Sequence, residues 1–88
     1  MNSITWTKEA EETFKKILDH LPQFHRSIAQ RLVKEKAEII ASEKGLNEVS
    51  KQQLIEAFFE EVPPAFKQMM ERLFHQLGIE FEFNRKEK

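Results

Sequence analysis

Cysteine is absent from this 88-residue chain, and glycine and proline are scarce, with two and three residues respectively. The lack of thiolates excludes disulfides, cysteine nucleophiles, iron–sulfur ligation and thiolate zinc sites. The two glycines stand apart in the sequence, so there is no glycine-rich loop to cradle a phosphate. No apolar run reaches the length of a membrane span or of a signal-peptide core. From these absences we expect a cytoplasmic protein with no bound cofactor and no membrane association.

An excess of charge of either sign is also missing. Fourteen Lys and Arg residues oppose fifteen Asp and Glu residues, for a formal net charge of -1. Proteins that bind nucleic acid usually carry a stronger positive field, so this balance disfavours such a partner. A long helix, a short extended loop and a following helix nevertheless resemble half of a histone fold. A weak histone-like nucleic-acid binder therefore stays open as an alternative.

The stretch from Phe24 to Lys44 carries a strong helical pattern. Its apolar residues recur at spacings of three and four, which places them on one face of a helix. They are Phe24, Ile28, Leu32, Val33, Ala37, Ile40 and Ala41. Pro22 suits the start of this helix, and Gly45 suits the left-handed position after its last turn. We expect the whole stripe to be buried by the rest of the chain.

A first helix is predicted before Pro22, from a cap at Thr5 or Thr7 to about Asp19 or His20. Its inward positions are Trp6, Ala10, Phe14, Ile17 and Leu18. After Gly45, the segment Leu46 to Val49 is too short for a helix and is expected to be extended.

Ser50 and Gln53 match a capping box, which predicts a third helix ending near Glu61. The apolar face of this helix is Leu54, Ile55, Phe58 and Phe59, and its glutamates are expected to face solvent. The pair Pro63-Pro64 breaks the chain and opens a fourth helix that ends near Gly78. The apolar stripe of the fourth helix is Phe66, Met69, Met70, Leu73, Phe74 and Leu77.

The segment Ile79 to Phe83 alternates apolar and acidic residues, which predicts a short strand. Its partner is Ser3 to Thr5, Leu46 to Val49, or the same strand of a second copy, which would make a homodimer. Residues 84–88 are expected to fray. The fold class is thus mainly all-α: one domain over residues 1–88, with three core helices, a fourth helix and one or two very short strands.

Residues with catalytic or ligand-binding chemistry are few. The histidines His20, His25 and His75 lack the spacing that would place two metal ligands on one helical face. Adjacent glutamates point in different directions on a helix, so no carboxylate pair for acid–base catalysis is indicated. We therefore expect no catalytic residue and no metal site. The neighbours Met69 and Met70 suit either core packing or an adaptable binding surface, because thioethers repack easily.

A set of residues in the first two thirds of the chain has a spacing typical of a known family. The set is Trp6, Ala10, the segment Leu21 to Arg26, Ala37, Gly45, Val49-Ser50 and Ala57. It resembles the small C-terminal domain of the B subunit of light-independent (dark-operative) protochlorophyllide reductase, and free-standing small proteins similar to that domain. The resemblance covers about Ile4 to Phe59, so we assign residues 1–62 to it. Residues 63–83 form an additional helix and strand.

The resemblance implies a role in chlorophyll biosynthesis, as an appendage of a nitrogenase-like oxidoreductase. This chain would be the appended domain without the catalytic body: a non-catalytic module that binds a protein partner or a tetrapyrrole. A component of the reductase itself is the alternative. The binding residues that the resemblance implies are Trp6, Phe24, His25 and Arg26, with the aromatics as a wall for a flat macrocycle and Arg26 for a propionate. The competing interpretation is that Trp6, Pro22 and Phe24 staple the first helix onto the second.

Overall fold

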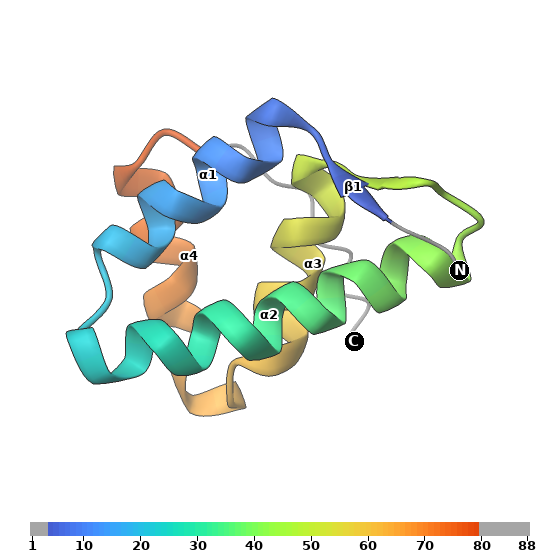
Figure 1. Ribbon diagram of the computed structural model, residues 1–88. Coiled ribbons are helices and arrows are strands. Elements are labelled where there is room, and N and C mark those ends of the chain that lie inside the picture. The colour runs from blue at the N-terminus through green and yellow to red at the C-terminus, as the bar shows by residue number, and fades with distance from the viewer. Residues whose placement is uncertain (1–3, 80–88) are drawn as a thin grey trace.

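A computed structural model describes residues 4–79 of the chain (Figure 1). Within this range the chain forms four α-helices, one 3₁₀ turn and two strands of two residues each. In order, they are β1 (Thr5–Trp6), α1 (Lys8–Asp19), α2 (Gln23–Glu43), β2 (Glu48–Val49), α3 (Lys51–Glu61), the 3₁₀ turn Pro64–Phe66 and α4 (Lys67–Gln76). The mainly all-α fold class is confirmed.

The ends of α1 and α2 follow the local chemistry of the sequence. The side-chain oxygen of Thr7 accepts a hydrogen bond from the backbone N–H of Ala10 at 3.0 Å, so Thr7 is the N-cap of α1. Pro22 is the N-cap residue of α2. Gly45 has a φ of 75° after the last turn of α2, and the following N–H of Leu46 donates to the carbonyl of Ala41 at 2.8 Å. The predicted ends of both helices are therefore confirmed at Thr7, Pro22 and Gly45. Trp6, which was expected on the inward face of the first helix, lies instead in β1, because the helix begins only after its cap at Thr7.

The ends of α3 and α4 agree with the sequence except at one point. The side-chain oxygen of Gln53 accepts a hydrogen bond from the backbone N–H of Ser50 at 3.0 Å, within the expected capping box. Pro64 does not start α4 directly, because its first turn is 3₁₀ and the α-helix begins at Lys67. Gly78 has a φ of 72° just after α4, where the fourth helix was expected to end.

The two short strands pair in parallel, with Thr5 opposite Glu48 and Trp6 opposite Val49. The extended segment before Ser50 is thus confirmed, and its partner is the N-terminal segment. Ile79 is buried in the turn after Gly78, where its N–H donates to the carbonyl of Phe74 at 2.9 Å. The remainder of the predicted tail strand, residues 80–83, and the predicted frayed residues 84–88 lie outside the described range. Pairing and dimerisation through that strand stay predictions.

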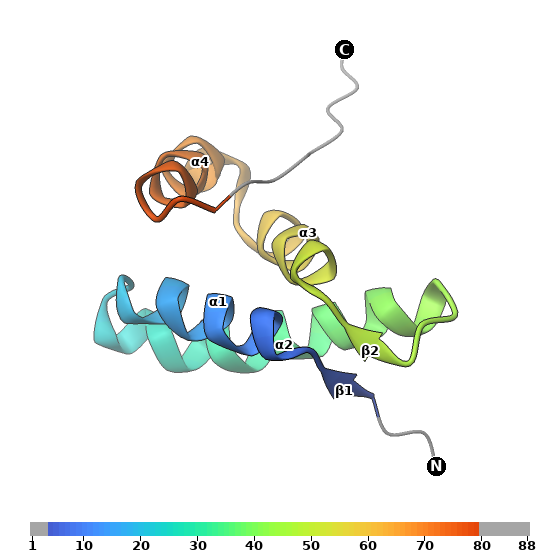
Figure 2. The same cartoon turned by 90° about the horizontal axis from the view of Figure 1, so that it is seen from above.

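The helices pack in two layers, which Figure 2 shows from above. The first layer holds α1 and α2 side by side, and α3 crosses over it with α4 at one end. Three aromatic rings join the layers: Phe58 of α3 lies 5.8 Å from Phe14 of α1 and 6.1 Å from Phe74 of α4, all between ring centroids. Phe58 and Phe74 are almost fully buried, so this edge-to-face cluster is the centre of the core.

The apolar stripe of α2 is only half buried, which corrects the expectation that all of it would be covered. Val33, Ala37, Ile40 and Ala41 are buried, whereas Phe24, Ile28 and Leu32 are 69%, 51% and 38% exposed. The reason is length: α2 has 21 residues and α3 has 11. Ion pairs between Lys44 and Glu56 and between Lys36 and Glu60 place α3 along the C-terminal half of α2. The N-terminal half extends beyond the end of α3.

Candidate functional site: an apolar groove

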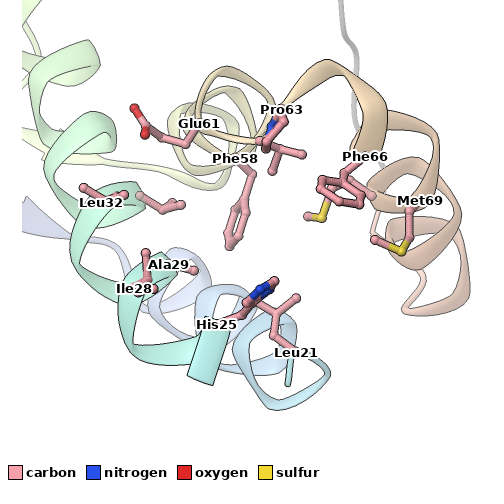
Figure 3. Close-up of a pocket in the computed structure, with 13 residues that line it drawn as sticks. Leu21, His25, Ile28, Ala29, Leu32, Phe58, Glu61, Pro63, Phe66 and Met69 are labelled. Atoms are coloured by element: carbon pink, nitrogen blue, oxygen red, sulfur yellow. The ribbon is translucent and has the colours of Figure 1, made fainter. Parts of the chain in front are cut away.

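An open groove of about 400 Å³ lies where α2 extends past α3 (Figure 3). One wall is the N-terminal half of α2, with Ile28, Ala29 and Leu32. The other wall is the 3₁₀ turn and the start of α4, with Phe66 and Met69. Both walls are therefore apolar, and they come from segments more than thirty residues apart in the sequence.

The floor of the groove is part of the core. Phe58 and Val33 are 1% and 2% exposed, yet both line the groove, together with Met70. The rim is far more accessible, because Phe66 and Met69 are 46% and 54% exposed. The groove thus has a fixed floor and exposed walls, one of which carries a flexible thioether.

Two titratable side chains line the groove, His25 and Glu61. Figure 3 shows them toward different ends, with Glu61 near Leu32 and His25 near Leu21. Glu61 differs from the other glutamates of α3: Glu56 lies 3.2 Å from the Nζ of Lys44, and Glu60 lies 3.3 Å from that of Lys36. Among residues 4–79, Glu61 has no ion-pair partner.

Trp6 lies away from the groove and holds β1 onto both helices of the first layer. Its ring stacks on Phe14 of α1 at 5.3 Å between centroids, and its Nε1 donates to the Oε2 of Glu38 at 2.9 Å. Partial burial raises the pKa of Glu38, but the hydrogen bonds from Trp6 and Lys34 and the charge of Lys34 outweigh it and leave that pKa below 4.5. Trp6 therefore joins α1 to α2, as the stapling interpretation expected of this residue, whereas Phe24 is 69% exposed and does not share that role.

Phe24, His25 and Arg26 lie together in the first turns of α2. The Phe24 and His25 rings lie edge to face at 4.3 Å between centroids, and both residues are exposed. The Arg26 side chain turns back to α1: its Nε donates to the carbonyl of Leu18 at 2.9 Å and its Nη2 to that of Leu21 at 3.1 Å. These carbonyls lie at and just beyond the end of α1, so Arg26 serves to cap that helix.

The four predicted binding residues do not form one site. Trp6 contacts α2 at Glu38, and Arg26 lies about 18 Å back along the helix axis at 1.5 Å per residue. Of the four, only His25 lines the groove. Sequence reasoning missed Ile28 and Leu32 because it assigned them to the core, and Glu61 because it assigned this residue to a solvated face.

The described part of the chain offers neither a metal site nor a membrane-spanning helix. No group of three or more His, Asp or Glu side chains there is placed to hold a metal ion. The Nδ1 of His20 lies 2.9 Å from the carbonyl of Lys16, one turn earlier in α1. No helix within residues 4–79 is long and apolar enough to cross a membrane. The apolar groove is thus a candidate binding site built from described residues.

Comparison with known proteins gives no match: no family model, curated protein or solved structure matches this chain. The resemblance to the C-terminal domain of the protochlorophyllide reductase B subunit stays a prediction from Trp6, the segment Leu21 to Arg26 and the other residues of that set.

Proposed function

We propose that this chain is a non-catalytic interaction module that binds a protein partner in the apolar groove. The observation that carries this proposal is the pair of exposed apolar walls around a groove of about 400 Å³. One wall holds Ile28 and Leu32 of α2, and the other holds Phe66 and Met69. Apolar surface gathered in one concave patch is typical of binding sites, whereas scattered apolar residues are ordinary.

The polar groups of the groove support a binding role over a catalytic one. General acid–base catalysis needs titratable groups that converge on one reacting atom. The two such groups that line the groove, His25 and Glu61, lie toward different ends of it in Figure 3. Apolar walls with few polar groups favour recognition of an apolar face.

A tetrapyrrole, or a place beside a protochlorophyllide reductase, is the second candidate. The observation that favours it is His25, an imidazole at the mouth of an apolar groove. Two features weigh against it. The Arg26 guanidinium, expected to hold a propionate, already donates to two carbonyls, and the carboxylate in the groove would repel an anionic ligand.

Site-specific photo-crosslinking tests the proposed function. A photo-reactive amino acid replaces Leu32 in the groove or, as the matched control, Ile39, an exposed apolar residue of the same helix that does not line the groove. A partner that crosslinks to position 32 in the source cells is identified and purified. Its affinity for the Leu32→Lys and Ile39→Lys variants is then measured by calorimetry.

We expect the dissociation constant to rise about tenfold or more for Leu32→Lys, because a charge enters an apolar interface, and to stay unchanged for Ile39→Lys. Equal crosslinking from both positions, or a purified partner indifferent to Leu32→Lys, would contradict the proposal. Saturable binding of protoporphyrin that Leu32→Lys abolishes would favour the tetrapyrrole instead.

A further inference from the structure

We infer that the groove takes an amphipathic helix of the partner protein, and that this helix carries a Lys or Arg beside its apolar face to pair with Glu61. This inference rests on the proposed function and names the kind of partner. It follows from the dimensions of the groove, the adaptability of one wall and the charge at one end.

The dimensions of the groove match two turns of a helix. Its wall on α2 runs from His25 to Val33, a rise of about 12 Å at 1.5 Å per residue. A docking helix with apolar residues at positions i, i+3 or i+4, and i+7 presents a stripe about 10 Å long. Ile28, Phe66 and Met69 on its walls are about half exposed, so a helix can reach the groove from solvent.

One wall of the groove can adapt its shape. Phe74 fixes the later part of α4 against Phe59 at 5.6 Å between ring centroids, and Met70 is 4% exposed. At the start of the same segment, Phe66 and Met69 line the groove and are about half exposed. An unbranched thioether beside an aromatic ring accommodates different apolar side chains, as helix-binding grooves require.

The charge at one end of the groove selects a cationic flank on the docking helix. A helix lying between Leu32 and Phe66 would partly desolvate Glu61, which has no ion-pair partner among residues 4–79. Desolvating an unpaired carboxylate is unfavourable, and a Lys or Arg on the incoming helix offsets this cost. The same charge would disfavour an acidic helix and an anionic ligand.

Two model peptides of about 18 residues test this inference. Both form amphipathic helices with leucine on one face; the other face is lysine in the first peptide and glutamate in the second. Each is titrated into the ¹⁵N-labelled full chain and followed by amide NMR shifts. Glu61→Gln is the test variant, and Glu43→Gln at the exposed end of α2 is its matched control.

We expect the leucine–lysine peptide to shift the signals of Ile28, Leu32 and Met69 in a saturable way, and the leucine–glutamate peptide to bind more weakly. Glu61→Gln should weaken the first peptide about two- to fivefold, because the pair lies at the groove rim, and Glu43→Gln should have no effect. Equal binding of both peptides, or equal effects of both variants, would overturn the inference.

Failure of this inference is distinguishable from failure of the proposed function. If neither peptide binds while the crosslinked partner still depends on Leu32, the partner is not a cationic amphipathic helix and the groove remains its binding site. If the partner is indifferent to Leu32→Lys and no peptide shifts the groove signals, the inference and the proposed function both fail.

Discussion

The two halves of α2 carry the same helical pattern and meet different surroundings. Residues 33–43 lie under α3, where the stripe residues are buried and two ion pairs connect the helices; the buried residues are Val33, Ala37, Ile40 and Ala41. Residues 23–32 extend past the end of α3, and Ile28, Ala29 and Leu32 among them form a wall of the open groove. One helix therefore serves the core at one end and offers a binding surface at the other.

The difference shows that apolar periodicity in a sequence does not by itself report burial. A continuous stripe predicts a face, but the length and direction of the covering helix decide how much of the face is covered. Here α3 has about half the residues of α2. The uncovered remainder is available for a partner, and the two halves of α2 should therefore respond differently to the same substitution.

The largest expected effect on stability comes from shortening an isoleucine side chain in each half of α2. Ile40→Ala removes a residue that is 7% exposed, and we expect it to lower the free energy of unfolding by about 2–4 kcal/mol. Ile28→Ala changes a residue that is 51% exposed, and we expect a change within about 0.5 kcal/mol. Urea unfolding measures both. Similar losses in the two variants would mean that residues 23–32 are covered in solution.

A smaller effect is expected at Arg26, whose guanidinium connects the open half of α2 to the end of α1. Arg26→Gln removes two charge-assisted hydrogen bonds to backbone carbonyls, so we expect a loss of about 1–2 kcal/mol. Arg31→Gln, an exposed arginine of the same helix, is the control and should stay within about 0.5 kcal/mol. An Arg26→Gln protein of unchanged stability that loses affinity for a porphyrin would instead assign this residue to a ligand.

The smallest expected effect on stability concerns the covered half of α2, where Trp6 donates a hydrogen bond to Glu38. Trp6→Phe keeps a ring to stack on Phe14 and removes the N–H donor, so we expect a loss of about 1 kcal/mol at neutral pH. Because the folded-state pKa of Glu38 lies below 4.5, its contribution is present above that value and is lost as the pH falls through the folded-state pKa.

The stability difference between the wild type and Trp6→Phe should therefore shrink at acidic pH, as urea unfolding at both conditions would show. Glu43→Gln is a suitable control, because this exposed glutamate lies at the end of the same helix. A difference that stays constant with pH would show that the ring of Trp6, rather than its hydrogen bond to Glu38, supplies the stability.

Local chemistry made much of the fold predictable from the sequence. A hydroxyl at Thr7, the pair Ser50 and Gln53, and the glycines at positions 45 and 78 each fix a helix end through bonds within a few residues. The 3₁₀ turn after Pro63 was missed, because proline at the first position suits both kinds of helix.

The candidate site was far less predictable. Ile28 and Met69 line opposite walls of one groove only because α3 ends at Glu61 and the chain turns at Pro63. Periodicity shows which face of a helix a residue lies on, but it does not give the distance between residues of different elements. It therefore gave no sign that Trp6 and Arg26 are far apart. One useful signal was present: the pair Met69-Met70, for which a binding surface had stayed open beside core packing. The structure divides these roles, with Met70 buried and Met69 exposed.

The most direct test of the groove as a binding surface is a search for intermolecular nuclear Overhauser effects. The protein is labelled at its isoleucine, leucine and methionine methyl groups and mixed with the unlabelled leucine–lysine peptide. The structure predicts contacts from the peptide to Ile28, Leu32 and Met69 and none to Ile40 or to the exposed Ile39. Contacts spread equally over Ile39 and Ile28, or contacts confined to Ile39, would contradict the assignment of the groove as the binding surface.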